Sequence, residues 1–307
     1  MLKNLKVWQK LTCIGLSFSL PIAVLLFFVV QGIDANIHFA QWEQYGNTYQ
    51  RPLEQLLQHL AEHRLLAHRL LDGSKHLQDD LARTGAQIEA DFQALLAVDS
   101  TLSEALQTTA DGLAKRKREH VQLRTVQQEW QALKAQLVSL QPAASDERHV
   151  HLIGDIRTLI CHIGDTANLI LDPDLDSYYL MDVTLLALPQ MQDRLQAVLA
   201  YGEGILQRQA ITLEERVQLS VYAALLKQSD LDRINVSTQT ALNEDQNFYG
   251  VSERLQKNLP PALQTSTAAL EAFIGLTQQL AQTDGVVLEP KAYVSSGMQA
   301  LAASFAT

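Results

Sequence analysis

The stretch that decides the fold is LTCIGLSFSLPIAVLLFFVV, residues 11–30, which contains no charged side chain. A helix of about 20 apolar residues is long enough to cross the hydrocarbon core of a membrane. The Thr, Gly, Ser and Pro residues inside the run are tolerated in membrane-spanning helices. We therefore predict a transmembrane helix over residues 11–31.

The charges beside this apolar run predict its orientation. Lys3, Lys6 and Lys10 precede it, and the first Lys or Arg that follows it is Arg51. Positively charged residues collect on the cytoplasmic side of a membrane protein. The N-terminus is therefore expected in the cytoplasm, and the bulk of the chain on the other side of the membrane.

A cleaved signal peptide is the alternative interpretation of the same run. Its apolar region is shorter, about 7–15 residues, and it ends at a small-residue cleavage site. Residues 31–34 (QGID) do not provide such a site, so we expect an uncleaved anchor. The predicted organisation is a cytoplasmic N-terminus (1–10), a transmembrane helix (11–31) and an exported helical domain (32–307).

The composition favours long helices and argues against a nucleic-acid-binding surface. The net charge is −10, from 24 Lys and Arg against 34 Asp and Glu, whereas nucleic-acid binding requires a basic face. Only 14 Gly and 8 Pro occur, and aromatic residues make up 6% of the chain, which is unlike a sheet protein. Cys13 and Cys161 cannot build a disulfide framework, so the exported part must be stabilised by helix packing.

Apolar residues recur at alternating spacings of three and four in three segments of the chain. The three seams are Leu53, Leu57, Leu60, Arg64, Ala67 and Leu71; Leu123, Val126, Trp130, Leu133, Leu137 and Leu140; and Ile153, Ile156, Ile160, Ile163, Ala167 and Ile170. This spacing is typical of helices packed side by side in bundles. We predict an all-α protein of about eight helices, several about 45–60 Å long.

Helix-breaking positions separate these runs, and two of them carry capping signals. The predicted breaks are 72–74, 98–100, Pro142, 172–173, 209–212, 243–247 and 284–285. Asp99 and Ser100 are suitable N-caps for a helix starting near Leu102. Thr212 and Glu215 form a capping box. The pattern fits an elongated antiparallel bundle, either as one rod or as two stacked four-helix modules that share the long helices.

The string LDPDLDSYYLMD, residues 171–182, is the densest polar feature of the chain. Pro173 suits a first helical position, and Asp174 and Asp176 then lie in the first turn, where they offset the helix dipole. One interpretation is a well-capped helix corner with its tyrosines packed into the bundle, and the other is a ligand pocket. A Ca²⁺ loop is disfavoured because the glycine and terminal glutamate of an EF-hand are missing.

Five side chains are candidates for binding a small solute: Arg64, Arg157, Tyr178, Tyr179 and Asp182. Arg64 falls on an apolar seam, and a buried guanidinium needs an anionic partner. That partner is either an Asp or Glu of a neighbouring helix or the carboxylate or oxyanion of a ligand. Arg157 lies beside another seam in the same way. The arginines therefore point to an organic anion as the solute.

Other polar clusters give weaker indications. His59 and His63 have the i, i+4 spacing of a metal pair, and His68 follows them, but the H-E-x-x-H pattern and any Cys/His zinc spacing are missing. We therefore expect no metal site and no cofactor. Residues 115–118 (KRKR) are predicted as the solvated surface of a helix. Nucleophile motifs and a phosphate-binding loop are also missing, so an enzyme is disfavoured.

Two patches of the sequence resemble a known family. They are the anchor with FAQWEQYGNTYQRPLEQLLQHLAEHR (39–64) after it, and ANLILDPDLDSYYLMDVTLLALPQ (167–190). Both resemble the N-terminal sensory regions of bacterial methyl-accepting chemotaxis receptors and of related sensor histidine kinases. The resemblance implies an inner-membrane anchor, a periplasmic helical bundle that senses a small solute, and a homodimer. It carries over no ligand-binding residue.

Receptors of that family continue into a second membrane helix, a linker module and a signalling domain. This sequence ends at Thr307, after a helix predicted over 292–306 that heads back to the membrane, so we expect truncation before a second membrane helix. The leading hypothesis is a chemoreceptor-type sensor that signals by small helix displacements. The alternatives are a structural rod without a ligand and the sensor region of a histidine kinase. Internally paired arginines without a cavity near Tyr178 would favour the rod.

Overall fold

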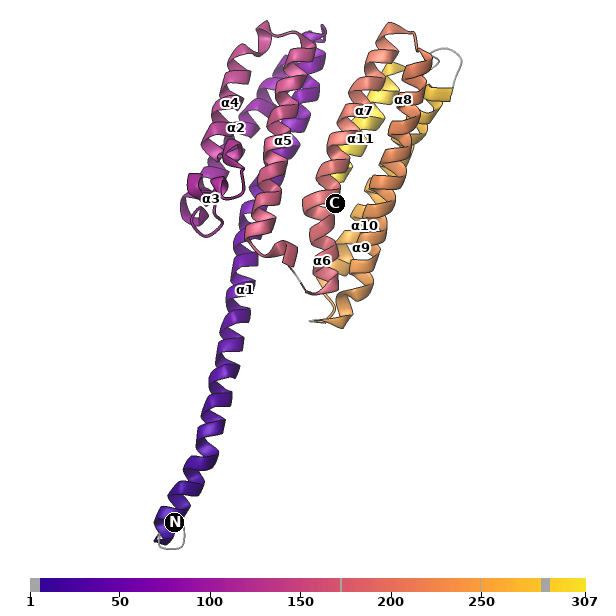
Figure 1. The fold of residues 1–307 in the computed structure, drawn as a ribbon. Helices are drawn as coiled ribbons and strands as arrows, with labels where there is room; N and C mark the ends of the chain where they lie inside the picture. Colours follow the sequence, from indigo (N-terminus) through magenta and orange to yellow (C-terminus); the bar gives the residue numbers. More distant parts are fainter. Residues whose placement is uncertain (1–5, 172, 249, 283–287) are drawn as a thin grey trace.

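The computed structural model describes residues 6–171, 173–248, 250–282 and 288–307 (Figure 1). Every regular element in these ranges is helical, and no strand occurs among them. The predicted all-α class is confirmed. Helices gather into two groups, and the long helix α1 extends far beyond both of them at its N-terminal end (Figure 1).

Helix α1, Val7–Leu71, joins the predicted anchor to the bundle without a break. Within the described part of the chain, it is the one helix long and apolar enough to cross a membrane. Its apolar side chains face outward, with Leu20 72% and Phe28 63% exposed. This exposure suits a lipid environment, because single exposed apolar residues are common in soluble proteins but a continuous apolar surface is not.

The first module is formed by the C-terminal part of α1 with three further helices. These are α2 (Gln78–Leu102), α4 (Leu123–Gln136) and α5 (Pro142–Thr166), and the short α3 (Ala110–Ala114) lies in the connection after α2. Nearly all residues of the three predicted seams are buried in this module, as the spacing predicts. Trp130 of α4 and Phe92 of α2 are fully buried at its centre.

The second module follows in the chain as two long helical runs and two further helices. The runs are α6 (Leu175–Asp182), η6 (Val183–Ala187) and α7 (Leu188–Arg208), then α8 (Leu213–Ala224), η7 (Leu225–Leu231) and α9 (Asp232–Glu244), and they are followed by α10 (Glu253–Gln282) and α11 (Pro290–Phe305). Both η6 and η7 are single π-helical segments inside continuous helices. The capping box of Thr212 and Glu215 at the start of α8 is confirmed. Helix α11 runs back beside α7 toward the N-terminal end of α1 (Figure 1).

The two modules lie side by side and are consecutive in the chain, rather than stacked end to end with shared helices (Figure 1). Each encloses its own apolar core, and two elements contribute to both: α1, through Ala61 and Leu65 in the second core, and η6, through Leu185 in the first. The contact is also held by an ion pair between Arg69 and Glu203, 3.1 Å apart. Helix α1 thus contacts the second module through both apolar side chains and an ion pair.

Two local predictions are wrong. The chain does not break at 98–100, because α2 continues to Leu102. Instead of capping a helix, the Asp99 carboxylate accepts hydrogen bonds from the Tyr49 hydroxyl at 2.9 Å and from Thr108 Oγ1 at 2.6 Å. Residues 115–118 are mostly exposed, but they form a turn after α3 rather than the middle of a helix. The breaks predicted at Asp172 and at 284–285 lie outside the described residues.

Gly202 allows α7 and α11 to approach closely. A Cβ atom at this position would overlap the ring and hydroxyl of Tyr293, which is fully buried and donates to the Val198 carbonyl at 3.2 Å. Gly202→Ala is therefore expected to destabilise the second module by about 1–3 kcal/mol, the usual cost of overpacking. The measurement is thermal unfolding of the detergent-solubilised chain, followed by circular dichroism.

Gly204 provides the matched control for this substitution. It lies two residues further along α7, and a Cβ atom there would meet nothing within 4 Å. Gly204→Ala should leave stability unchanged or raise it by up to about 1 kcal/mol, because alanine is the better helix former. Equal effects of the two substitutions would show that the close approach at Tyr293 is not limiting.

Candidate functional site: a cavity between α1 and α6

A cavity of about 300 Å³ lies between α1 and the helical run that starts with α6. Its described lining is Glu43, Asn47, Gln50, Glu54, Leu169, Ser177, Leu180, Met181, Thr184 and Leu185. This volume is at the lower end of the range for small-molecule sites in proteins. The LDPDLDSYYLMD string thus borders a cavity, on the face of α6 that carries Ser177, Leu180 and Met181.

Gln50 supplies an unpaired polar atom to this cavity. Its side chain is 3% exposed, and its Nε2 donates to the Ile160 carbonyl at 2.7 Å. Its Oε1 is buried and has no hydrogen-bond partner among the described residues. A buried acceptor without a donor costs free energy, typically about 1–3 kcal/mol. A ligand that donates a hydrogen bond here would recover that cost.

Glu54 follows Gln50 by one helical turn and supplies a titratable group. Burial raises the pKa of the Glu54 carboxyl to about 7, and the nearby Arg51 guanidinium opposes this rise. A positive charge placed against the carboxylate would favour its ionised form. The described lining also includes Glu43 and contains no Lys or Arg. The cavity therefore favours a cationic or hydrogen-bond-donating solute over an anion.

The wall opposite α1 contains a π-helical segment. Thr184 and Leu185 of η6 line the cavity, and the Thr184 hydroxyl donates to the Leu180 carbonyl at 2.8 Å. A π segment inserts one residue into the helical repeat and occurs frequently at functional sites. The π segment thus interrupts the regular hydrogen-bond ladder of this wall.

The five predicted ligand-binding residues do not converge on one site. Tyr178 and Tyr179 lie on α6 with their rings edge to face at 5.5 Å, and Tyr178 is 41% exposed. Asp182 binds Arg233 at 2.7 Å. None of these three appears in the described lining of the cavity, although their immediate neighbours do.

The two arginines have internal partners elsewhere. Arg64 is buried, and its Nε lies 3.6 Å from Asp146 Oδ1. Arg157 binds Asp193 at 2.7 Å, across the contact between the modules. Both cations on which the expectation of an organic anion depended thus face carboxylates of the chain, although the buried Arg64 Nε makes no hydrogen bond.

The sequence contains one signal for the cavity that the heptad analysis did not use. Gln50 precedes Leu53 by three residues, so it extends the seam of Leu53 and Leu57 by one position. A polar residue on a seam must be hydrogen-bonded or functional. Glu54 has no such signal, since its position beside the seam is the same as that of many solvated glutamates.

The histidines of α1 that have i, i+4 spacing contact other polar groups. His59 Nδ1 lies 2.5 Å from Asp91 Oδ2, and His63 Nδ1 lies 2.8 Å from His149 Nε2. His68 Nδ1 lies 2.7 Å from Asp146 Oδ2. These histidines therefore belong to polar networks of the first module rather than to a common metal site.

No protein-family model, curated protein or solved structure matches this chain.

Proposed function

We propose that this chain is the sensory part of a membrane-anchored receptor of the chemotaxis-receptor type. The observation that carries the proposal is the position of the cavity. One wall is α1, which continues to the apolar segment, and the other is the run from α6 that contains the family-like string. A solute bound there would contact directly the helix that leads to the membrane.

The solute proposed is small and positively charged or rich in hydrogen-bond donors. Gln50 Oε1 offers an unpaired acceptor, and Glu54 offers a carboxyl group whose pKa of about 7 is close to neutral pH. An ammonium group can donate to both, and a charge-assisted hydrogen bond is stronger than a neutral one. The aliphatic part of the solute would pack on Leu180 and Met181.

Signalling would follow from a shift of α1 against α6. A ligand changes a conformational equilibrium only when it binds one state more tightly than the other. Closing the cavity around a solute would move η6 toward α1, and displacements of about 1–2 Å between packed helices are an established switching mode. The π segment is the element most readily repacked, because it already departs from the regular helix.

The remaining features of the proposal come from the sequence. Lys6 and Lys10 before the apolar run support a cytoplasmic N-terminus, with both modules in the periplasm of a bacterium. The resemblance supports an inner-membrane location and a homodimer, and output either to chemotaxis signalling or to a histidine kinase. In this proposal the chain binds the lipid bilayer as well as the small solute and a second copy of itself.

A structural rod without a ligand is the second candidate. It is favoured by the internal pairing of Arg64 with Asp146 and of Arg157 with Asp193. It does not account for the unpaired Gln50 oxygen beside a cavity. Ligand binding therefore separates the two candidates.

Titration calorimetry of the full chain in detergent micelles tests the proposal. We expect a short diamine or arginine to bind, and succinate and nitrate not to bind. Glu54→Gln is expected to weaken binding at least about tenfold, equivalent to about 1.4 kcal/mol. Glu214→Gln, an exposed position at the start of α8, is the matched control and should leave the affinity unchanged.

The pH dependence gives an independent readout. Because Glu54 loses its proton near a pKa of about 7, affinity for a cation should rise between about pH 6 and pH 8. Glu54→Gln should abolish this rise. Binding of anions alone, or a pH dependence that survives the substitution, would refute the proposed chemistry, and binding of no solute would favour the rod.

A further inference from the structure

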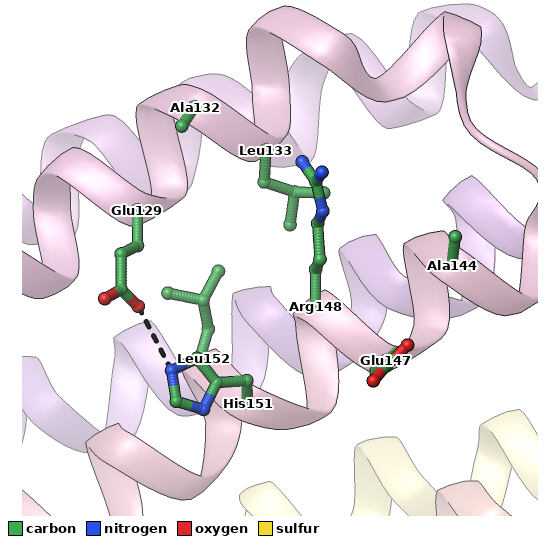
Figure 2. A pocket seen from close by; sticks show the side chains of 8 residues that line it. All are labelled: Glu129, Ala132, Leu133, Ala144, Glu147, Arg148, His151 and Leu152. Atoms are coloured by element: carbon green, nitrogen blue, oxygen red, sulfur yellow. Dashed lines mark ion pairs between the residues drawn. The ribbon is translucent and has the colours of Figure 1, made fainter.

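Four metal-ligating side chains gather on the outer side of the first module, away from the cavity between α1 and α6. His151 and Asp155 lie one turn apart on α5, Glu129 comes from α4, and His120 comes from the 3-10 turn η3 (Glu119–Val121). Figure 2 shows His151 and Glu129 pointing toward one another across the space between their helices. These residues adjoin a surface cavity of about 580 Å³, which Glu129 and His151 help to line.

The distances between the ligand atoms fit a tetrahedral ion. His151 Nε2 lies 3.4 Å from Glu129 Oε2 and 3.6 Å from Asp155 Oδ2, and the three atoms all lie within 4.8 Å of one another. Ligands of Zn²⁺ lie about 2.0–2.2 Å from the ion, which places neighbouring corners of the tetrahedron about 3.3–3.6 Å apart. His120 Nε2 lies 4.0 Å from the other Asp155 oxygen, Oδ1, outside the group of three, and its side chain would have to turn to become the fourth ligand.

The cluster contains buried oxygen atoms that nothing in the described chain satisfies. Asp155 is 5% exposed, and its Oδ2, which faces His151, has no hydrogen-bond partner. Glu129 Oε2 is likewise buried without a partner. The separations of 3.4 and 3.6 Å from His151 are longer than normal N–H···O hydrogen bonds. Two carboxylates therefore flank His151, and each has a buried oxygen atom without a hydrogen-bond donor.

An ion at the centre of the cluster would give both unpaired oxygen atoms a partner. Arg148, the nearest cation on the same rim, is directed elsewhere, since its Nη1 donates to Gln136 Oε1 at 2.9 Å (Figure 2).

We propose that Glu129, His151, Asp155 and His120 form a binding site for a divalent transition-metal ion, with Zn²⁺ the best fit. Two imidazoles select Zn²⁺ and its neighbours over Mg²⁺ and Ca²⁺, which prefer oxygen ligands alone. His151 is 63% and His120 54% exposed, so the ion can enter from solvent. The bound ion would join η3, α4 and α5 in the first module.

The test uses the full chain without an added histidine tag, purified in detergent and treated with a chelator. Titration with zinc chloride should give one ion per chain and raise the melting temperature. Co²⁺ should bind in competition with Zn²⁺ and give the intense visible absorption of a tetrahedral site. Mg²⁺ in excess should produce neither effect.

Substitutions locate the ion. His151→Ala and Asp155→Asn should each weaken Zn²⁺ binding at least tenfold, whereas His120→Ala should give a smaller loss and change the Co²⁺ spectrum. His76→Ala, at an exposed histidine of η2 (Lys75–Leu77), and Glu147→Gln, which points away from the cluster, are the matched controls (Figure 2). Because His151 is mostly exposed, its substitution should leave the fold intact.

Three results would overturn the proposal. They are an absence of Zn²⁺ binding by the folded native chain, an octahedral Co²⁺ spectrum, and equal losses in the control variants and in His151→Ala. Since the cluster shares no lining residue with the cavity between α1 and α6, its failure would leave the proposed sensory function standing, and the reverse also holds.

Discussion

Replacing Asp146 by alanine is expected to lower the free energy of unfolding by about 3–5 kcal/mol, the cost of leaving a buried charge without its partner. Arg64 is 7% exposed, and its Nε lies 3.6 Å from Asp146 Oδ1. The other carboxylate oxygen binds His68 Nδ1 at 2.7 Å, and this hydrogen bond raises the pKa of His68. Asp146 thus contacts both the Arg64 guanidinium and the His68 imidazole of α1.

Chemical denaturation of the full chain in detergent, followed by tryptophan fluorescence, measures this effect. The matched control is Asp193→Ala, which breaks the ion pair with Arg157. Those two side chains are 31–35% exposed, so the loss there should be below about 1 kcal/mol. The double variant Arg64→Met with Asp146→Leu should recover most of the stability, because it removes both charges. If Asp146→Ala costs no more than Asp193→Ala, Arg64 is not held by this pair.

Acidification from about pH 7 to about pH 4.5 is expected to destabilise the first module through a buried pair of neutral histidines. His63 and His149 are 2% and 0% exposed, and His63 Nδ1 lies 2.8 Å from His149 Nε2. His149 Nδ1 donates to the Ser145 carbonyl at 2.8 Å, so its Nε2 accepts the proton of His63. The pair is fully bonded only when both rings are neutral.

The direction of the pH effect follows from the two pKa values. Burial is the largest cause of both shifts, and it lowers the pKa of His63 to about 3 and that of His149 to about 4, from 6.5. The unfolded chain therefore takes up protons below about pH 6.5 that the folded chain refuses. The stabilising contribution of the neutral histidine pair is therefore complete above that pH and is lost as the pH falls toward 4. At about 1.4 kcal/mol per pKa unit, the two histidines together account for a loss of about 5 kcal/mol near pH 4.5.

Charged neighbours on other elements modify this loss. Lys134 of α4 lowers the pKa of His63, and Arg64 and Asp146 act on His149 in opposite directions. The pKa values of Glu54 and His68 are raised, so the folded chain binds their protons more tightly than the unfolded chain does. Acidification therefore increases the stability contributed by these two groups and opposes the effect of the histidine pair. A comparison of variants at each pH is therefore needed to isolate the histidine pair.

The double variant His63→Leu with His149→Leu removes both titrating groups and should reduce the loss of stability between about pH 7 and pH 4.5 by about 5 kcal/mol. His76→Leu, at an exposed histidine, should leave the profile unchanged. The Trp130 ring is 4.8 Å from that of His63, so its fluorescence should report the protonation of the pair directly. An unchanged slope in the double variant would refute this origin of acid lability.

The seams were predictable because a helix repeats its faces at a fixed interval, and burial then follows from apolar spacing alone. The same spacing placed Gln50 and Arg64 inside the first module. It could not predict their partners, which both lie on α5 and are more than 80 residues away in the chain. The break expected at 98–100 failed for the same reason, since Asp99 is held by the distant Tyr49 and not by its own helix terminus.

The cavity and the metal cluster depend still more on tertiary contacts. Glu54 and His151 look like ordinary solvated residues in the sequence, and only the approach of α6 and α4 gives them neighbours. A cluster such as Glu129, His151 and Asp155 has no fixed spacing along the chain, because its members come from two antiparallel helices. Such a site is a property of the packing of α4 against α5.

The sequence by itself determined an anchor-like apolar helix, an all-α class and the faces that each long helix buries. These follow from local periodicity and from the transfer of apolar side chains out of water. Only the tertiary structure decided that two modules lie side by side, that α1 forms a wall of a cavity with α6, and that the predicted arginines are paired internally. The physical reason is that a helical face specifies how much must be buried, whereas shape and charge complementarity between distant segments select the partner.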